Sequence, residues 1–208
     1  MFRITLIFLL FASLHSITVA GWFKERCAKT FGRTFMQVWY RFLYNSVSGI
    51  TAAIAIFFIM QTPDTVLWTG PAWFRWSMHV IQFAGFIFGG LSFRYLDSRE
   101  FMGFRQVWRY LRNGEVAGNF EGMSEKGLVT TGVYGIVRHP LYVAGIIIFT
   151  FSPDITVNGL TITVLADLYF LFGMLIEELR FLRIFGDEYA EYMKRVPRVI
   201  PRFIDRNR

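Results

Sequence analysis

The sequence predicts an all-α, polytopic membrane helix bundle with about five transmembrane helices. Three observations lead to this fold class. Of the 208 residues, 54% are hydrophobic and only 18% are charged. The apolar residues gather in runs bounded by charged residues, proline or glycine, and no run alternates strictly as a barrel strand would. This composition does not fit a simple water-soluble enzyme.

The apolar runs give the expected helices. A bilayer core about 30 Å thick requires roughly 20 apolar residues per helix, so about five helices use half of the chain and leave short connections. We therefore expect one integral membrane domain over residues 1–208, with three spans in 1–91 and a cofactor-binding catalytic half in 92–208. The five runs cover residues 4–20, 42–60, 74–93, 137–152 and 159–176.

The first run has an alternative interpretation as a cleaved signal peptide. It is short for a span, and it ends in Thr18-Val19-Ala20, which resembles a signal-peptidase site. Cleavage would export the basic stretch from Lys24 to Arg41. Because this outcome conflicts with the positive-inside rule, we expect the run to remain as a helix.

The distribution of positive charge predicts the orientation. Of the 22 Lys and Arg residues, five lie between runs one and two, seven from the end of run three to the first residues of run four, and eight after run five. With five spans, these segments share one side, which the positive-inside rule assigns to the cytoplasm. The N-terminus is then outside and the C-terminus is cytoplasmic. Because the cations are spread over three loops among acidic residues, the expected partner is the lipid bilayer and not nucleic acid.

A histidine stands at the expected mouth of the fourth helix. Proline favours the first helical position and holds the preceding residue in an extended conformation, so a helix should begin at Pro140 with His139 just before it. Tyr142 follows His139 by three residues and can face the same side. The free amides of the first turn suit an anionic group. Alternatively, Arg138, His139 and Tyr142 only anchor the helix to lipid headgroups.

Two adjacent carboxylates, Glu177 and Glu178, lie at the inner end of the fifth run. At the edge of the hydrocarbon such a pair is unfavourable unless a cation lies beside it. We therefore expect a ligand cation or a loop arginine nearby. The alternative is a pair of salt bridges to Arg180 and Arg183 at helical spacing.

The ordered motifs of the C-terminal half resemble the superfamily of isoprenylcysteine carboxyl methyltransferases and phospholipid methyltransferases. The resemblance covers about residues 92 to 202. Within this superfamily, the segment 153–160 and the opening from His15-Ser16 to Lys24 resemble the bacterial methanethiol S-methyltransferase branch. The motifs are Gly-Val-Tyr134, Arg138-His-Pro-x-Tyr142, Glu177-Glu178, Phe185-Gly-x-x-Tyr-x-x-Tyr192 and Arg195-Val-Pro197.

The resemblance implies S-adenosylmethionine as the methyl donor. It implies a cytoplasm-facing pocket formed by the loop before the fourth helix and by the C-terminal helix. It also implies catalytic roles for His139, Tyr142 and Glu178. The implied cofactor contacts are Lys126, Gly127, Leu128, Val129, Tyr134, His139, Pro140, Leu141, Tyr142, Glu177 and Glu178.

Two positions depart from the family pattern. The prenylcysteine enzymes have a substrate-binding arginine four residues before the first glutamate, where this chain has Gly173. This difference weakens carboxyl methylation as the activity. The family also has glycine two residues after the tyrosine, where this chain has Ala144, with Gly145 one place later.

The remaining polar residues leave the acceptor open. Asp167 lies about three helical turns before Glu178 and is a candidate for lining a substrate route, or else for an interhelical hydrogen bond to His79, Gln82 or Asn45. The chain's three scattered histidines give no metal-ligand spacing.

The first-choice acceptor is a small or lipophilic thiol, and the base that would deprotonate it is not evident. His139, Glu178 and water are the candidates. A prenylcysteine carboxylate and a phospholipid amine are the alternative acceptors. An NADPH-dependent membrane reductase is the alternative from another class of chemistry.

Overall fold

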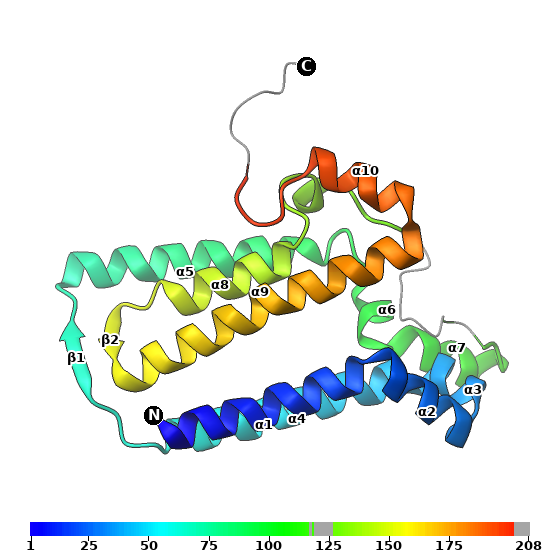
Figure 1. Ribbon diagram of the computed structural model, residues 1–208, viewed down its shortest axis with the longest axis horizontal. Coiled ribbons are helices and arrows are strands. Elements are labelled where there is room, and N and C mark those ends of the chain that lie inside the picture. Colours follow the sequence, from blue (N-terminus) through cyan, green and yellow to red (C-terminus); the bar gives the residue numbers. More distant parts are fainter. Residues whose placement is uncertain (117, 119–126, 202–208) are drawn as a thin grey trace. The chain divides into compact units, whose positions relative to one another are not determined.

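The computed structural model describes residues 1–116, 118 and 127–201. These residues form two compact units that interleave along the chain (Figure 1). The N-terminal unit comprises residues 2–63 and 96–127, and the C-terminal unit comprises residues 1, 64–95 and 128–208. Lys126, one of the expected cofactor contacts, lies outside the described residues.

The N-terminal unit is built on two long apolar helices that lie side by side (Figure 1). Tyr44 reaches across to His15, with its hydroxyl 2.8 Å from Nε2 of the ring. Asn45 donates to the carbonyl of Phe101 at 3.0 Å and so ties the later helices to this pair. The elements are α1 (Phe2–Val19), α2 (Gly21–Phe31), α3 (Arg33–Phe35), the π-helix η1 (Met36–Tyr40), α4 (Arg41–Met60), α6 (Ser98–Met102) and α7 (Phe104–Asn113).

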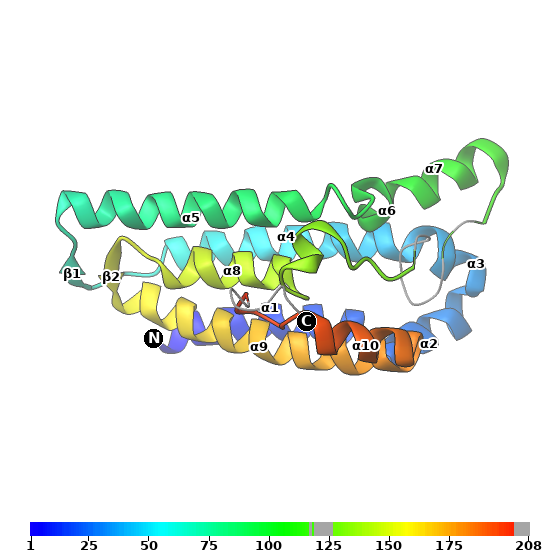
Figure 2. The ribbon, with the colours of Figure 1, turned by 90° about the horizontal axis from the view of Figure 1, so that it is seen from above.

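The C-terminal unit holds three apolar helices, of which the short α8 packs against both α5 and α9 (Figures 1 and 2). Small residues permit the close approach of α5 and α8. A Cβ added at Gly89 would lie 2.9 Å from the Cβ of Ala144. The elements are β1 (Val66–Thr69), α5 (Ala72–Ser92), the 3-10 helix η2 (Gly132–Gly135), α8 (Pro140–Thr150), β2 (Asp154–Thr156), α9 (Val157–Phe185) and α10 (Asp187–Arg195).

Each of the five predicted apolar runs forms a helix, but their lengths differ. Three helical segments are long and apolar enough to cross a membrane: Phe2–Val19, Arg33–Met60 and Val157–Phe185. They support an integral membrane protein. In contrast, α8 has only 11 residues, which at 1.5 Å per residue is about 16 Å, half of a bilayer core. The number of five spans therefore remains a prediction.

The all-α prediction missed a small antiparallel sheet. β1 pairs with β2, with Thr69 opposite Asp154 and a register shift between Val66 and Trp68. Pro63, Pro71 and Pro153 interrupt helix formation around these segments, whose β-branched residues favour strands.

Asp64, in the connection that precedes β1, holds the first turn of α9 in place. The carboxylate of Asp64 accepts hydrogen bonds from the backbone N–H groups of Thr65 at 2.8 Å and Asn158 at 2.9 Å. Burial alone would raise the pKa of Asp64, but hydrogen bonds from Asn158, Thr156 and Thr65 hold it below its ordinary value. The carboxylate thus satisfies amides that the first turn of α9 leaves free.

Candidate functional site

The mouth of α8 has the structure that the sequence predicts. The helix begins at Pro140, and His139 precedes it with φ −124° and ψ 64°. The segment before it is shaped by Gly132, whose φ is +64°. A Cβ on Gly132 would lie 1.9 Å from Cζ of Tyr95, so only glycine fits here without displacing that ring.

The imidazole of His139 lies between the two predicted carboxylates. Its Nδ1 is 3.4 Å from Oε2 of Glu177, and its Nε2 is 3.2 Å from Oε1 of Glu178. His139 is only 3% exposed. The ring of Tyr142 meets it edge to face, with a centroid distance of 5.6 Å. Four predicted site residues, from the mouth of α8 and from α9, are therefore brought together.

Two arginines form ion pairs with the carboxylate of Glu178. Arg138 donates to Oε1 through Nε at 2.9 Å and Nη2 at 2.6 Å. Arg198 donates to Oε2 through Nη2 at 2.5 Å and also contacts both oxygens through Nε. The expected nearby cation for Glu178 is thus a loop arginine. We call Arg138, His139, Glu177, Glu178 and Arg198 the paired-carboxylate site.

Of the two alternative salt bridges to the next turn of α9, one is present. Arg180 lies 3.8 Å from Glu177, at the limit of an ion pair. Within the described part of the chain, no ion pair involves Arg183. The alternative of a salt bridge to Arg183 was wrong because the carboxylate of Glu178 turns toward the loops that carry Arg138 and Arg198.

Arg138 also anchors the segment after α10. Its Nη1 donates to the carbonyls of Met193 at 3.1 Å and Val196 at 2.6 Å, and its backbone N–H donates to the carbonyl of Pro197 at 2.9 Å. Residue-type patterns pointed to Arg138 only as part of a motif, and Arg198 was not predicted as a site residue. Arg198 directly follows Val-Pro, and this position was the signal in the sequence that could have identified it. At this point the chain returns toward α9.

The two glutamates differ in how fully their carboxylates are already paired with cations. The side chain of Glu178 is 4% exposed and carries two guanidinium partners, whereas that of Glu177 is 26% exposed. Its oxygens lie at longer distances from cations, 3.4 Å from His139 and 3.8 Å from Arg180. Glu177 is thus the carboxylate with capacity for an additional cation.

Two tyrosines, one from η2 and one from α10, are joined by a hydrogen bond beside this region. The Tyr192 hydroxyl donates to the carbonyl of Tyr134 at 2.6 Å. Leu128, another expected contact, packs against the buried cluster that includes Tyr189 and Tyr192. Burial, with a further contribution from the Glu177 carboxylate, raises the pKa of Tyr134 to about 12. Tyr134 is therefore a neutral hydrogen-bonding group at physiological pH.

The remaining residues expected at the site make fewer contacts that bear on their predicted roles. Pro140 is fully buried, and Leu141 and Val129 are half-buried. Gly127 has φ +76°. Asp167 lies well away along α9 and accepts a hydrogen bond from Thr150 at 2.8 Å, so the predicted partners His79, Gln82 and Asn45 were wrong. Those three side chains bond elsewhere.

The hollows found in the described part of the chain do not include residues of the paired-carboxylate site. Two hollows in the described part of the chain lie in the N-terminal unit and contain none of the predicted site residues. Among the described residues, no group of three or more His, Cys, Asp or Glu side chains is arranged to hold a metal ion. The cytoplasmic cofactor pocket remains a prediction.

Comparisons with known proteins give family membership. A model of the family described as NnrU protein matches residues 3–175. The chain is 26% identical to methanethiol S-methyltransferase 2 of Bradyrhizobium diazoefficiens over 96% of this chain and 72% of that protein. It is also 26% identical to methanethiol S-methyltransferase of Pseudomonas deceptionensis, over 94% of this chain and 71% of that protein.

Another relative, matched over a shorter part of the chain, carries a different activity in its name. The chain is 28% identical to protein-S-isoprenylcysteine O-methyltransferase of Schizosaccharomyces pombe, over 65% of this chain and 61% of that protein. No solved structure matches the chain.

Proposed function

Because the chain belongs to the NnrU family and to the bacterial methanethiol S-methyltransferase branch of the isoprenylcysteine carboxyl methyltransferase superfamily, we propose that it transfers a methyl group from S-adenosylmethionine to a small or lipophilic thiol. The observation that carries this proposal is the His139 imidazole held between Glu177 and Glu178. It unites the motifs at the mouth of α8 with those at the end of α9.

The residues present fit such a cofactor. Bound S-adenosylmethionine supplies a methyl group on a positively charged sulfur. Glu177 has a partly exposed carboxylate and would balance the ammonium or sulfonium charge. Tyr134 and Tyr142 would line the site, together with Lys126, Gly127, Leu128, Val129, His139, Pro140 and Leu141.

We assign Glu178 to the support of this site. Its charge is already neutralised by Arg138 and Arg198, so it adds little attraction for a further cation. It holds the Nε2 side of His139 instead. A residue fixed by several charge-assisted hydrogen bonds positions its neighbours well, and transfer reactions depend strongly on such positioning.

We assign to His139 the role of accepting the proton from the thiol. A thiolate is the nucleophile, so the sulfur must lose its proton before or during attack on the methyl group. Both ring nitrogens of His139 face a carboxylate oxygen within 3.4 Å. A proton taken up by the ring would therefore be held in a hydrogen bond on either side.

A prenylcysteine carboxylate is the second candidate acceptor, favoured by the name of the fission yeast relative. The geometry at Gly173 opposes it. A Cβ on Gly173 would lie 3.2 Å from Cε1 and 3.4 Å from the hydroxyl oxygen of Tyr142. A side chain at this position would require the Tyr142 ring to shift by a few tenths of an ångström, so Tyr142 lies directly beside the position where the prenylcysteine enzymes carry their substrate-binding arginine.

We infer the orientation of the observed helices in the membrane from the distribution of positive charge along the chain. The N-terminus would lie outside, and the C-terminus and the paired-carboxylate site would face the cytoplasm. A reporter that is active only in the cytoplasm, fused to the C-terminus, tests this orientation. An inactive C-terminal fusion of a properly inserted protein would contradict it.

The decisive experiment measures transfer of a labelled methyl group from S-adenosylmethionine by the purified protein in detergent. The acceptors are a panel of volatile thiols, a prenylcysteine analogue and phosphatidylethanolamine. We expect label on thiols, and we expect its loss in His139→Ala. Calorimetry with S-adenosylhomocysteine and NADPH accompanies it, because binding of NADPH alone would indicate the reductase.

A further inference from the structure

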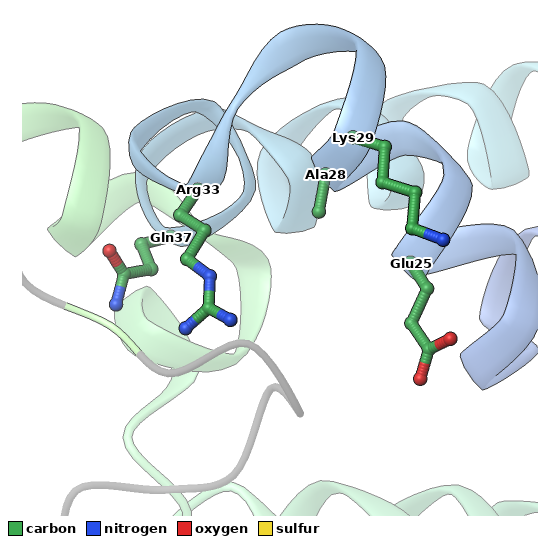
Figure 3. A pocket seen from close by; sticks show the side chains of 5 residues that line it. All are labelled: Glu25, Ala28, Lys29, Arg33 and Gln37. Atoms are coloured by element: carbon green, nitrogen blue, oxygen red, sulfur yellow. The ribbon is translucent and has the colours of Figure 1, made fainter.

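A hollow of about 460 Å³ beside α2 brings charged side chains of both signs together (Figure 3). In this view, Glu25 and Lys29 lie on one side, and Arg33 and Gln37 lie on the other. No ion pair within the described ranges involves Glu25, Lys29 or Arg33. Their charges are therefore available to a ligand. Ala28 completes the lining.

The wall behind this hollow is an unusual piece of backbone. Gln37 belongs to the π-helix η1, a conformation that is frequent at functional sites. Gly118 packs so closely that a Cβ there would lie 2.5 Å from the carbonyl oxygen of Gln37 and 3.1 Å from Cγ of Gln106. Gln106 is 4% exposed, and its Oε1 has no hydrogen-bond partner among the described residues.

We expect the hollow to lie at the level of lipid headgroups. α2 connects α1 to the helical segment that contains α4, and both are long and apolar enough to cross a membrane. Trp22 and Phe31, near the two ends of α2, are 55% and 62% exposed. The guanidinium of Arg26 lies 5.7 Å from the Trp22 ring centroid. Exposed tryptophan and arginine at a span end are typical of the membrane interface.

We propose that this hollow binds the headgroup of a zwitterionic phospholipid. Lys29 and Arg33 would hold the phosphate, for which these two cations are suited. Glu25 would hold the ammonium group and so distinguish this headgroup from an anionic one. The volume lies within the range of about 300 to 1,000 Å³ for small-ligand sites. The proposal concerns binding alone and does not depend on methyl transfer.

The test titrates the purified full chain in detergent with short-chain phosphatidylethanolamine, phosphatidylglycerol and water-soluble glycerophosphoethanolamine. We expect phosphatidylethanolamine to bind most tightly. The double variant Lys29→Ala/Arg33→Ala should weaken its binding by about tenfold or more, because charge-assisted hydrogen bonds are lost. Glu25→Gln should remove the preference over phosphatidylglycerol while leaving the phosphate contacts.

A matched double variant controls for net charge. Arg99→Ala/Arg112→Ala removes the same charge from exposed positions of α6 and α7 that do not line the hollow. It should leave binding unchanged. Equal weakening in both double variants would overturn the proposal, as would an unchanged lipid preference in Glu25→Gln. Equal affinity for the water-soluble ester would overturn the lipid assignment. Circular dichroism and gel filtration confirm that each variant is folded.

Discussion

Replacing Glu178 by glutamine is expected to destabilise the protein, whereas the same change at Glu177 should mainly weaken cofactor binding. The difference follows from their partners. Glu178 accepts hydrogen bonds from Arg138 and Arg198 and is 4% exposed, and Glu177 is 26% exposed with longer contacts. The two substitutions change the same functional group at adjacent positions of α9, so each controls for the other.

The size of the effect can be worked out from the two ion pairs of Glu178. Removing one partner of a buried pair costs about 3 to 5 kcal/mol, whereas exposed pairs contribute about 0.2 to 1 kcal/mol. Arg138 is 7% exposed and belongs to the first class, and Arg198 is 39% exposed and belongs nearer the second. Glutamine keeps one oxygen acceptor, so we expect the lower limit, about 3 kcal/mol. This corresponds to a fall in Tm of about 6 to 12 °C.

Thermal unfolding in detergent and calorimetric titration with S-adenosylhomocysteine separate the two effects. Glu177→Gln should leave Tm near that of the wild type and weaken binding by about 10- to 100-fold, as for a lost hydrogen bond to a charged group. The reasoning is refuted if Glu178→Gln melts like the wild type, or if Glu177→Gln binds with unchanged affinity.

Four further predictions concern stability. Gly132→Ala should destabilise the protein by about 2 kcal/mol or more, because its φ is positive and Tyr95 occupies the Cβ position. Tyr192→Phe should lower the stability by about 1 kcal/mol through loss of its hydrogen bond. Tyr189→Phe should be nearly neutral, because the Tyr189 hydroxyl has no partner among the described residues. The folded-state pKa of Asp64 lies below its ordinary value of 3.8, so its contribution to stability is present above pH 3.8 and is lost as the pH falls below this value.

Thermal melts at neutral pH check the three substitutions, and an acid titration of stability checks the prediction for Asp64. Gly135→Ala is the control for Gly132, because its added Cβ would meet nothing closer than 3.4 Å. A large loss in Tyr189→Phe would show that its hydroxyl has a partner after all. Asp64→Asn should lose the acid-dependent component, and a wild-type pH profile in this variant would contradict the assignment.

The sequence predicted the helices well where a long apolar run coincides with one element. It also placed the start of α8 at Pro140, because proline acts locally and needs no knowledge of packing. The small sheet was missed because its strands have only three and four residues. Each strand is stable only through the other, whose paired residues are 85 to 90 positions away in the chain. Such pairing has no local pattern.

Within the site, residue types were easier to predict than partners. The sequence indicated that Glu178 requires a cation and that a loop arginine could supply it, but it did not identify which arginines. Arg138 and Arg198 are 40 and 20 residues away from Glu178, and their role depends on the folding back of both loops. Asp167 similarly found Thr150 on α8 in place of the three predicted partners.

The extended link that contains β2 explains how so short a helix can bring His139 to the end of α9. From Val157 to Glu178, α9 advances about 32 Å. The 11 residues of α8 cover about 16 Å, and the six residues 151–156, if stretched, add up to about 20 Å. The strand therefore serves as a spacer that sets which turn of α9 the imidazole faces, and deleting two of its residues would carry the histidine toward Met174 and away from both acids.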